Sequence, residues 1–298
     1  MNFRKIGLED KDLVDAFTSR FGEGSCQHSF TTWYTLQEKY GDEIALEEDI
    51  LFVRRGRLCT PERDVYLVPL GEADIRRRVE LLMEDCHGRN RKLSFSTATQ
   101  KAAVEIMEAF GSRFECEERR DYAEYIYRTE PLIRMEGPEL AKKRNNLGRF
   151  RKNCEGDVLV EALSAENLKD VRLYCQCWMD NNMESHDQEA LSKEYRCIER
   201  QLDHFSDLGL LGFLVRINQE VRGFCYGVPL SGEVFDGLIM KADRDVTQIN
   251  VFMYSEIARR CGCPWLNAEE DVGVPGLRES KLSYRPAYLL KKYILREV

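Results

Sequence analysis

Residues 211–241 read LGFLVRINQEVRGFCYGVPLSGEVFDGLIMK and carry the clearest structural pattern of the chain. Three apolar runs, rich in the residue types that favour strands, are separated by the pairs Asn218-Gln219 and Ser231-Gly232. Polar pairs of this kind suit tight hairpin turns. The stretch therefore predicts an antiparallel meander, with strands at 211–217, 220–229 and 233–241.

Helical and extended patterns flank this meander. Apolar residues recur at helical spacing in 249–261, and an extended segment begins at Trp265. Two further helices are predicted before the meander, at 165–182 and 188–207. The order of helix, helix, three strands, helix and strand indicates an α+β fold.

The first half of the chain repeats this element order more weakly. Helices are predicted near 30–40, 73–86 and 99–110, and strands near 44–54, 65–69, 92–96 and 114–127. No residue-level repeat supports a duplication, which rests on element order alone. We expect two tandem α+β units, each a mixed, mainly antiparallel sheet flanked by helices. The N-terminal unit is placed at 1–137 and the C-terminal unit at 138–298, which begins with a connecting helix at 139–150.

Composition indicates a globular protein without a membrane span. The chain has 298 residues, of which 43% are hydrophobic and 32% are charged, and it is long enough to bury a sizeable core. No window reaches the roughly eighteen apolar residues of a membrane-spanning helix, and the start MNFRKIGLEDKDL lacks the apolar core of a signal peptide. We expect a cytoplasmic protein with no integral membrane segment.

The use of cysteine and histidine argues against disulfides and a metal site. The chain has eleven cysteines, an odd number, and only four histidines. The pairs Cys175/Cys177 and Cys261/Cys263 are separated by one residue, whereas zinc knuckles commonly use two. We expect reduced thiols and no metal.

Charge is distributed unevenly along an acidic chain with a net charge of −8. Residues 139–152 hold six basic residues and one acidic residue, and residues 278–298 hold six basic and two acidic residues. Two local basic islands on an acidic protein favour one anionic ligand over a stable nucleic-acid coat. Solvated helix faces explain the same pattern.

The segment WLNAEEDVGVPGLRESKLSYRP, residues 265–286, holds the candidate catalytic residues. If 265–271 is extended, Asn267, Glu269 and Asp271 point to one side of the strand. Two carboxylates in one pocket raise the pKa of one and leave the other ionised as a base, so Glu269 and Asp271 are the catalytic candidates. The structural alternative is an ion pair between Lys241 and one of these acids.

Candidate substrate-binding residues come from both basic islands and from the meander. Asn267 could orient a carbonyl or cap a turn, and Tyr284 could donate to an oxyanion or pack in the core. The basic residues at the start of the 139–150 helix oppose the helix dipole, which suggests a role in anion binding or in pairing with acids elsewhere. The full candidate set is Lys241, Asn267, Arg278, Lys281, Tyr284, Lys142, Lys143, Arg144 and Asn145.

Three segments give the chain a resemblance to a known family. They are KKRNNLGRF (142–150), MKAD (240–243) and LNAEEDVGVPGLRESKLSYRPAYLLKKY (266–293). They resemble the phosphatidylglycerol lysyltransferase C-terminal domain family, whose members are built from two GNAT-like folds in tandem. The resemblance covers nearly the full length, with weaker matches in the first half.

The chain also departs from this family at specific positions. Met240 and Ala268 stand where family members commonly have an acidic residue and an arginine. Residues 244–248, RDVTQ, contain no glycine, whereas relatives that use acetyl-coenzyme A carry a glycine-rich pyrophosphate loop there. Glycine leaves backbone N–H groups accessible to phosphates, so its absence weakens the case for a coenzyme A donor.

The resemblance implies an aminoacyl- or acyltransferase. The acyl group would move from an ester or thioester donor, with charged tRNA favoured, to a hydroxyl or amine acceptor. No bound cofactor is implied, although aminoacyl-tRNA or acyl-coenzyme A could serve as donor. Two alternatives stay open: a catalytically silent tandem module that binds an anionic metabolite or lipid headgroup, and a coenzyme A-dependent N-acetyltransferase.

Overall fold

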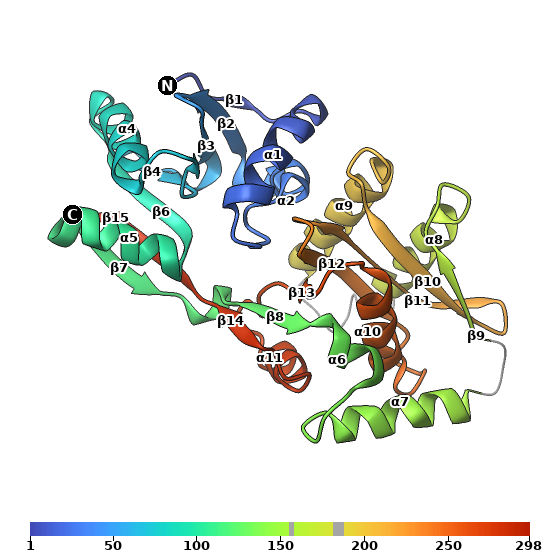
Figure 1. The fold of residues 1–298 in the computed structure, drawn as a ribbon. Helices are drawn as coiled ribbons and strands as arrows, with labels where there is room; N and C mark the ends of the chain where they lie inside the picture. The colour runs from blue at the N-terminus through green and yellow to red at the C-terminus, as the bar shows by residue number, and fades with distance from the viewer. Residues whose placement is uncertain (155–157, 181–187) are drawn as a thin grey trace. The chain divides into compact units, whose positions relative to one another are not determined.

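The computed structural model describes residues 1–154, 158–180 and 188–298, which form two compact units. Unit 1 comprises Met1–Tyr125, Glu269–Arg278 and Tyr288–Val298, and unit 2 comprises Ile126–Ala268 and Glu279–Ala287. Each unit has its own sheet and its own helices (Figure 1). The boundary at 137/138 between two GNAT-like repeats stays a proposal.

Unit 1 is built on a sheet in the order β1-β2-β3-β4-β6-β15-β7, with β5 paired to β3. The strands of this sheet are β1 (Arg4–Lys5), β2 (Asp42–Glu47), β3 (Ile50–Arg55), β4 (Arg63–Tyr66), β5 (Leu70–Gly71), β6 (Lys92–Thr99), β7 (Phe114–Glu118) and β15 (Lys292–Glu297). The residues of β14 (Tyr288–Leu290) belong to unit 1, but β14 is a strand of the other sheet. The helices of unit 1 are α1 (Lys11–Phe21), α2 (Phe30–Thr35), α3 (Gln37–Tyr40), α4 (Ile75–Gly88) and α5 (Gln100–Phe110).

The last strand of the chain lies inside the sheet of unit 1. β15 pairs antiparallel with both β6 and β7, so the red strand in Figure 1 runs between two strands of the first half. Leu295 of β15 is fully buried in a core cluster with Phe95 of β6, Phe114 of β7 and Ile106 of α5. Burial of these side chains ties the C-terminal segment to the first-half strands.

Unit 2 is built on a second sheet, in which β8-β13-β12-β11-β10-β9 are successive neighbours. Its strands are β9 (Val158–Ala162), β10 (Leu211–Ile217), β11 (Glu220–Pro229), β12 (Val234–Ala242) and β13 (Trp265–Asn267). Its helices are α6 (Thr129–Arg134), α7 (Ala141–Asn153), α8 (Leu168–Asp180), α9 (Gln188–Asp203) and α10 (Ile249–Arg260). Two further elements, β8 (Glu124–Arg128) and α11 (Pro275–Leu282), contribute residues to both units.

The predicted α+β class is confirmed, with two mixed sheets flanked by helices. The first two strands of the meander match β10 and β11 at both ends, and the third is shifted by one residue. Asn218 and Gln219 both have positive φ angles, 53° and 69°, as a type I′ hairpin turn requires. Local turn chemistry therefore sets this part of the fold.

Several predicted elements in the first half are wrong. The expected strand 44–54 is a hairpin of β2 and β3, which turns at Glu48 and Asp49 with φ angles of 51° and 56°. The expected strand 114–127 is interrupted by a 3₁₀ turn at Arg120–Tyr122, which separates β7 from β8. The expected helix 30–40 is two short helices.

The second-half helices differ only at their ends. The helix expected at 165–182 appears as α8, and residues 181–182 lie outside the described residues. The helix expected at 188–207 ends at Asp203. Across 1–154, 158–180 and 188–298, no helix is both long enough and apolar enough to cross a bilayer.

Candidate functional site

β12 and β13 are parallel neighbours that pair over three residues and then part. The paired positions end at Asp236 and Asn267, and β12 continues to Ala242. In the described part of the chain, no strand pairs with residues 237–242 on the side of β13. These six residues are all half-buried. We call this opening between residues 237–242 of β12 and the end of β13 the fork.

A β-bulge lies at the base of the fork. Gly237 and Leu238 of β12 lie opposite the single residue Gly227 of β11, because the register shifts between two adjacent pairings. Gly227 must be glycine, since an added Cβ would lie 1.9 Å from the carbonyl oxygen of Asp236. Bulges bend the strand that carries the extra residue, so this one changes the course of β12 where its pairing with β13 ends.

Two buried polar residues mark the last paired position of the fork. Asp236 and Asn267 are register partners, and both are fully buried. Asn267, an expected substrate-binding residue, thus lies inside unit 2 next to the point where the strands part. Buried polar groups of this kind are normally hydrogen-bonded and fix local geometry.

Lys281 holds the chain that leaves β13. Its side chain is 7% exposed, and its Nζ donates to the carbonyl oxygen of Ala268 over 2.6 Å. The Tyr127 hydroxyl in turn donates to the main-chain oxygen of Lys281 over 2.8 Å. This ammonium is therefore engaged by the backbone directly after β13, and it fixes the path on which the chain departs from β12.

Replacement of Lys281 by methionine is expected to lower the free energy of unfolding by about 1.5–3 kcal/mol, because a charge-assisted hydrogen bond is lost and the Ala268 carbonyl is left without it. Urea denaturation followed by circular dichroism measures the change. Lys142→Met, at an exposed position, is the matched control and should change the value by less than about 0.5 kcal/mol. Equal effects in the two variants would contradict the anchoring role.

An aromatic stack in unit 2 joins residues from the two basic islands. The Tyr284 ring stacks on the Tyr254 ring with centroids 4.0 Å apart, and the Lys143 Nζ lies 3.8 Å from the centroid of the Tyr284 ring. Tyr284 is 2% exposed, and burial raises the pKa of its hydroxyl and of the Tyr254 hydroxyl above their usual range. The structure thus brings together Lys143 and Tyr284, two members of the expected set.

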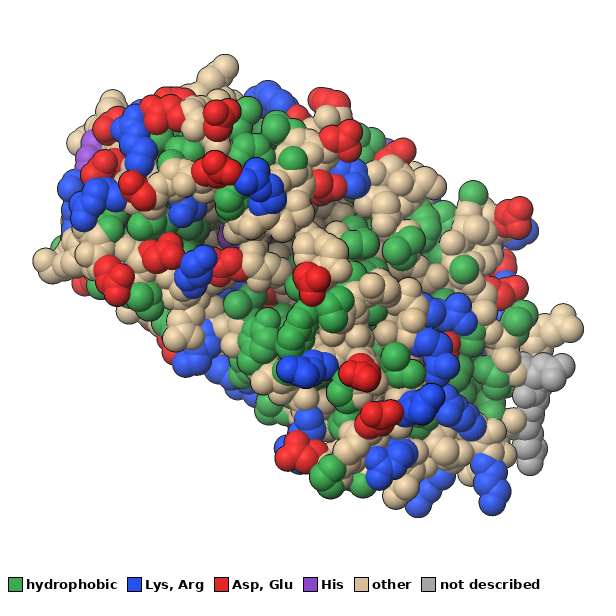
Figure 2. All heavy atoms as spheres, in the orientation of Figure 1, with side chains coloured by type: hydrophobic (Ala, Val, Ile, Leu, Met, Phe, Trp, Pro, Cys, Tyr) green, Lys and Arg blue, Asp and Glu red, His purple; other side chains and the backbone are tan. Residues whose placement is uncertain are grey.

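Helix α7 presents an exposed basic surface. Leu147 and Phe150 are buried, and the Phe150 ring stacks on Phe252 of α10 at 4.6 Å, which fixes this side of the helix. Other positions of the helix carry exposed cations, which have no ion pair within the described residues. Figure 2 shows Lys and Arg side chains gathered over this helix. We call the residues Lys142, Arg149, Arg151 and Lys152 the basic face of α7.

The remaining candidates near α7 have different environments. Arg144 donates to the carbonyl oxygens of Met135 and Gly137 over 2.8 and 2.9 Å, so it holds the connection between α6 and α7. Asn145 is exposed.

Lys241 is held by two helices of unit 2. Its Nζ donates to Glu194 of α9 over 2.8 Å and lies 3.8 Å from the ring centroid of Trp178 of α8. A carboxylate and an aromatic face thus fix this ammonium at the end of β12.

The expected strand through residues 265–271 is wrong beyond Asn267, where β13 ends. Glu269 has a φ angle of 56°, a left-handed conformation that does not continue a strand. The alternation that placed Asn267, Glu269 and Asp271 on one strand face therefore does not apply. Glu269, Asp271 and Arg278 belong to unit 1, and the other candidate residues belong to unit 2.

Asp271 is a buried carboxylate that accepts several hydrogen bonds. It accepts from the Tyr125 hydroxyl over 2.5 Å, from the Gly273 N–H over 2.9 Å, and from Arg278 Nε and a terminal nitrogen over 2.9 and 2.7 Å. Burial alone would raise the pKa of Asp271, but these donors outweigh it and hold the pKa well below its usual range. A carboxylate of such low basicity takes up no proton near neutral pH. The geometry favours a positioning role, in which Asp271 orients Arg278 at the start of α11.

A buried polar network in unit 1 was not expected from the sequence. Lys292 Nζ lies 2.7 Å from Glu124 and donates to the Ser25 hydroxyl over 2.6 Å, and that hydroxyl donates to Glu124 over 2.9 Å. All three residues are at most 1% exposed. They are far apart in sequence, so no local pattern indicates that they meet.

Two titratable groups with shifted pKa values lie in the same interior. Burial raises the pKa of Asp42 to about 6, an effect that Arg55, with its Nε 3.7 Å away, partly offsets. Burial and the Lys292 charge lower the pKa of His28 to about 4. Arg55 also donates to Gln27 over 2.8 Å. Shifts of this size tie the stability of unit 1 to pH.

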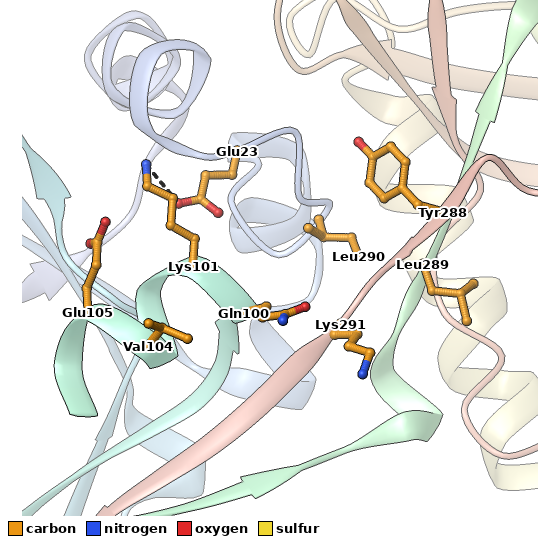
Figure 3. Close-up of a pocket in the computed structure, with 9 residues that line it drawn as sticks. All are labelled: Glu23, Gln100, Lys101, Val104, Glu105, Tyr288, Leu289, Leu290 and Lys291. Atoms are coloured by element: carbon orange, nitrogen blue, oxygen red, sulfur yellow. Dashed lines mark ion pairs between the residues drawn. The ribbon is translucent and has the colours of Figure 1, made fainter. Parts of the chain in front are cut away.

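Two surface hollows, of about 570 and 890 Å³, lie within the range of ligand-pocket volumes, and a third of about 330 Å³ lies at its lower end. The first, in unit 1, lies beside the start of α5, where Lys101 points to Glu23 at 3.8 Å with Leu290 nearby (Figure 3). The second, in unit 2, is lined by Tyr174 and Arg222 among others. Within the described residues, none of the expected site residues lines any of these hollows.

Comparison with solved structures supports the fold. A crystal structure of a conserved protein of unknown function from Bacteroides thetaiotaomicron is 27% identical, with full coverage of both chains and a TM-score of 0.92. The structure of L-PGS from Bacillus licheniformis is 13% identical, covers 96% of this chain and 91% of that chain, and has a TM-score of 0.65. The second similarity, at this identity, concerns the fold alone.

Sequence comparison identifies the family. An uncharacterized protein of Mycoplasmoides gallisepticum is 23% identical over 289 residues, which cover 89% of this chain and 86% of the relative. The family model described as phosphatidylglycerol lysyltransferase, C-terminal, matches residues 18–296. The match spans both units, and the chain therefore belongs to the phosphatidylglycerol lysyltransferase C-terminal domain family.

Proposed function

We propose that this chain is an acyltransferase that moves an acyl group from an ester or thioester donor, with charged tRNA favoured, to a hydroxyl or amine acceptor. The fork in unit 2 is the observation that carries the proposal. Family membership supports it, and the match covers both units of the chain.

The fork offers main-chain donors for acyl transfer. Where β12 has lost its neighbour, alternate residues of 237–242 direct N–H and C=O groups toward the open side. The addition of a nucleophile to an ester places negative charge on the carbonyl oxygen, and preorganised N–H groups stabilise that charge. The pairing with β11 holds these groups in place, so they need little reorganisation during the reaction.

The corresponding position among the described residues of unit 1 has no such opening. The parallel pair there is β4 and β6, and β4 ends at Tyr66, its last position paired with β6, so no part of β4 continues beyond the pairing. β6 also runs directly into α5, because Thr99 both ends the strand and caps the helix with its side chain. The proposal therefore places the reaction in unit 2.

The basic face of α7 supports tRNA as the donor. Its four exposed cations can neutralise RNA phosphates, since within the described residues no carboxylate neutralises them. A coenzyme A donor is supported less well, because residues 244–248 have no glycine to expose backbone donors. The family name supports one acceptor for the test, a hydroxyl group of phosphatidylglycerol.

The test combines donor binding with group transfer. The probe is radiolabelled aminoacyl-tRNA, offered with phosphatidylglycerol vesicles or with a peptide amine. We expect the wild-type chain to transfer label to one acceptor. Arg151→Glu/Lys152→Glu should weaken tRNA binding and reduce the slope of log affinity against log salt by about 1.5–2.

Two control variants separate the steps. Arg57→Glu/Lys169→Glu makes the same change of charge at exposed positions outside α7 and should leave tRNA binding nearly unchanged. Gly237→Val places a branched side chain in the fork and should abolish transfer while tRNA still binds. tRNA binding without any transfer by the wild-type chain would instead support the silent binding module, and equal losses in both double variants would remove α7 as the donor site.

A further inference from the structure

Lys143 occupies an unusual position for a lysine. It lies in the first turn of α7, which begins at Ala141, and it is half-buried beside the exposed Lys142. Its ammonium lies 3.8 Å from the centroid of the Tyr284 ring. Within the described residues it has no carboxylate partner.

Three effects disfavour the charged form of this amine. Partial burial removes water from the ammonium, and the neighbouring Lys142 repels it; together they lower the pKa of Lys143. The positive end of the helix dipole adds to the repulsion. The Tyr284 ring attracts the cation and so opposes these effects, but it also holds the nitrogen in one place. Lys143 is therefore a fixed amine with an enlarged neutral fraction.

A neutral lysine amine is a nucleophile toward activated acyl groups. Lys142, in the same turn, is exposed and has no ring contact within the described residues, so water solvates its ammonium more fully. The two neighbours should thus differ in reactivity although they have similar positions in sequence.

We propose that Lys143 is a site of N-acylation on this chain, with an acyl thioester or acyl phosphate as the acyl donor. With a thioester, the Lys143 nitrogen attacks the carbonyl carbon, the new C–N bond forms and the C–S bond breaks. The electron pair of that bond leaves with the thiolate sulfur, which takes up the proton lost by the amine. The product is an uncharged amide and a free thiol.

Acylation would alter the surface that α7 presents. The amide carries no charge, so the first turn of α7 loses one positive charge and the cation–π contact with Tyr284. This consequence rests on the proposed function. If tRNA binds at the basic face of α7, acylation of Lys143 should weaken the binding of tRNA. The modification would then regulate donor binding.

The test measures acetylation at each lysine without any tRNA. The full chain is incubated with acetyl-coenzyme A in one arm and acetyl phosphate in another, over a range of pH, and is then digested with an endoprotease that does not cut at lysine. Quantitative mass spectrometry should show Lys143 acetylated several times faster than Lys142 or Lys152. Lys142→Gln removes the repelling charge, so it should slow acetylation at Lys143 and move the midpoint of its pH profile upward.

The outcomes separate this inference from the proposed function. Equal rates at Lys142, Lys143 and Lys152, or an unchanged pH profile in Lys142→Gln, would overturn the assignment of Lys143. Fast acetylation at Lys143 in a chain that fails to bind tRNA would uphold the modification site and remove only its regulatory consequence.

Discussion

A chain that ends at residue 137 is expected not to form a cooperatively folded unit 1. It lacks β15, which lies inside the sheet between β6 and β7, and with it the Lys292 ammonium of the buried network. The loss of Leu295 alone removes about 2 kcal/mol of hydrophobic burial, and the inner edges of β6 and β7 are left without a partner. Thermal unfolding followed by near-UV circular dichroism should show no cooperative transition.

A matched chain distinguishes the missing strand from other effects of truncation. Residues 1–125 followed by a flexible linker and residues 288–298 restore β15 but still lack 269–278. This chain should regain part of the near-UV signal, because the strand can enter the sheet again. A cooperative transition in the 1–137 chain near that of the full-length chain would show that β15 is dispensable.

Two buried groups are expected to impose opposite pH dependences on stability. The pKa of Asp42 is about 6 in the folded chain and 3.8 ordinarily. Between these pH values the folded chain binds more protons than the unfolded chain, so stability falls as the pH rises through them. His28 has a pKa of about 4 when folded and an ordinary value of 6.5, so the unfolded chain binds the extra proton and stability rises with pH over that window. Each effect reaches about 1.4 kcal/mol per pH unit.

Single substitutions should uncover each effect. Between about pH 4 and pH 6, the wild-type free energy of unfolding should vary little, because the two slopes cancel. In Asp42→Asn, the free energy of unfolding should rise with pH. In His28→Asn, it should fall with pH. Urea titrations at several pH values give the three slopes. If both variants run parallel to the wild-type chain, neither group titrates with a shifted pKa in the folded state.

The meander could be predicted because the residues that specify its strands and turns are adjacent in sequence. Asn218 and Gln219 specify a turn by their own backbone preferences, and the apolar runs on either side end where that turn begins. The same logic failed at 44–54, where the apolar runs 44–46 and 50–53 flank Glu47, Glu48 and Asp49, and the turn contains no glycine or asparagine to mark it. Residue types indicate a turn only when they are the types that the turn favours.

Some residues of the site could be predicted from the sequence, but their contacts could not. Lys143 and Tyr284 were both expected from their basic islands, yet their contact joins segments about 140 residues apart and depends on how α7 packs against α10. Lys281 was expected at a phosphate or in solvent and is instead buried against a carbonyl group. The Ser25, Glu124 and Lys292 network gave no signal, because charged residues are mostly exposed and their burial depends on tertiary partners.

The place of β15 also sets an order of events during synthesis. The ribosome releases β6 and β7 some 170 residues before β15, which at about 5–20 residues per second is a delay on the order of ten seconds or more. Throughout that interval the two strands lack the partner that separates them, and their open edges can pair with other nascent chains. Folding of the N-terminal unit therefore waits until residues 292–297 have been synthesised, and a chaperone that shields strand edges should raise the yield of the native protein more than one that acts after all folding strands are made.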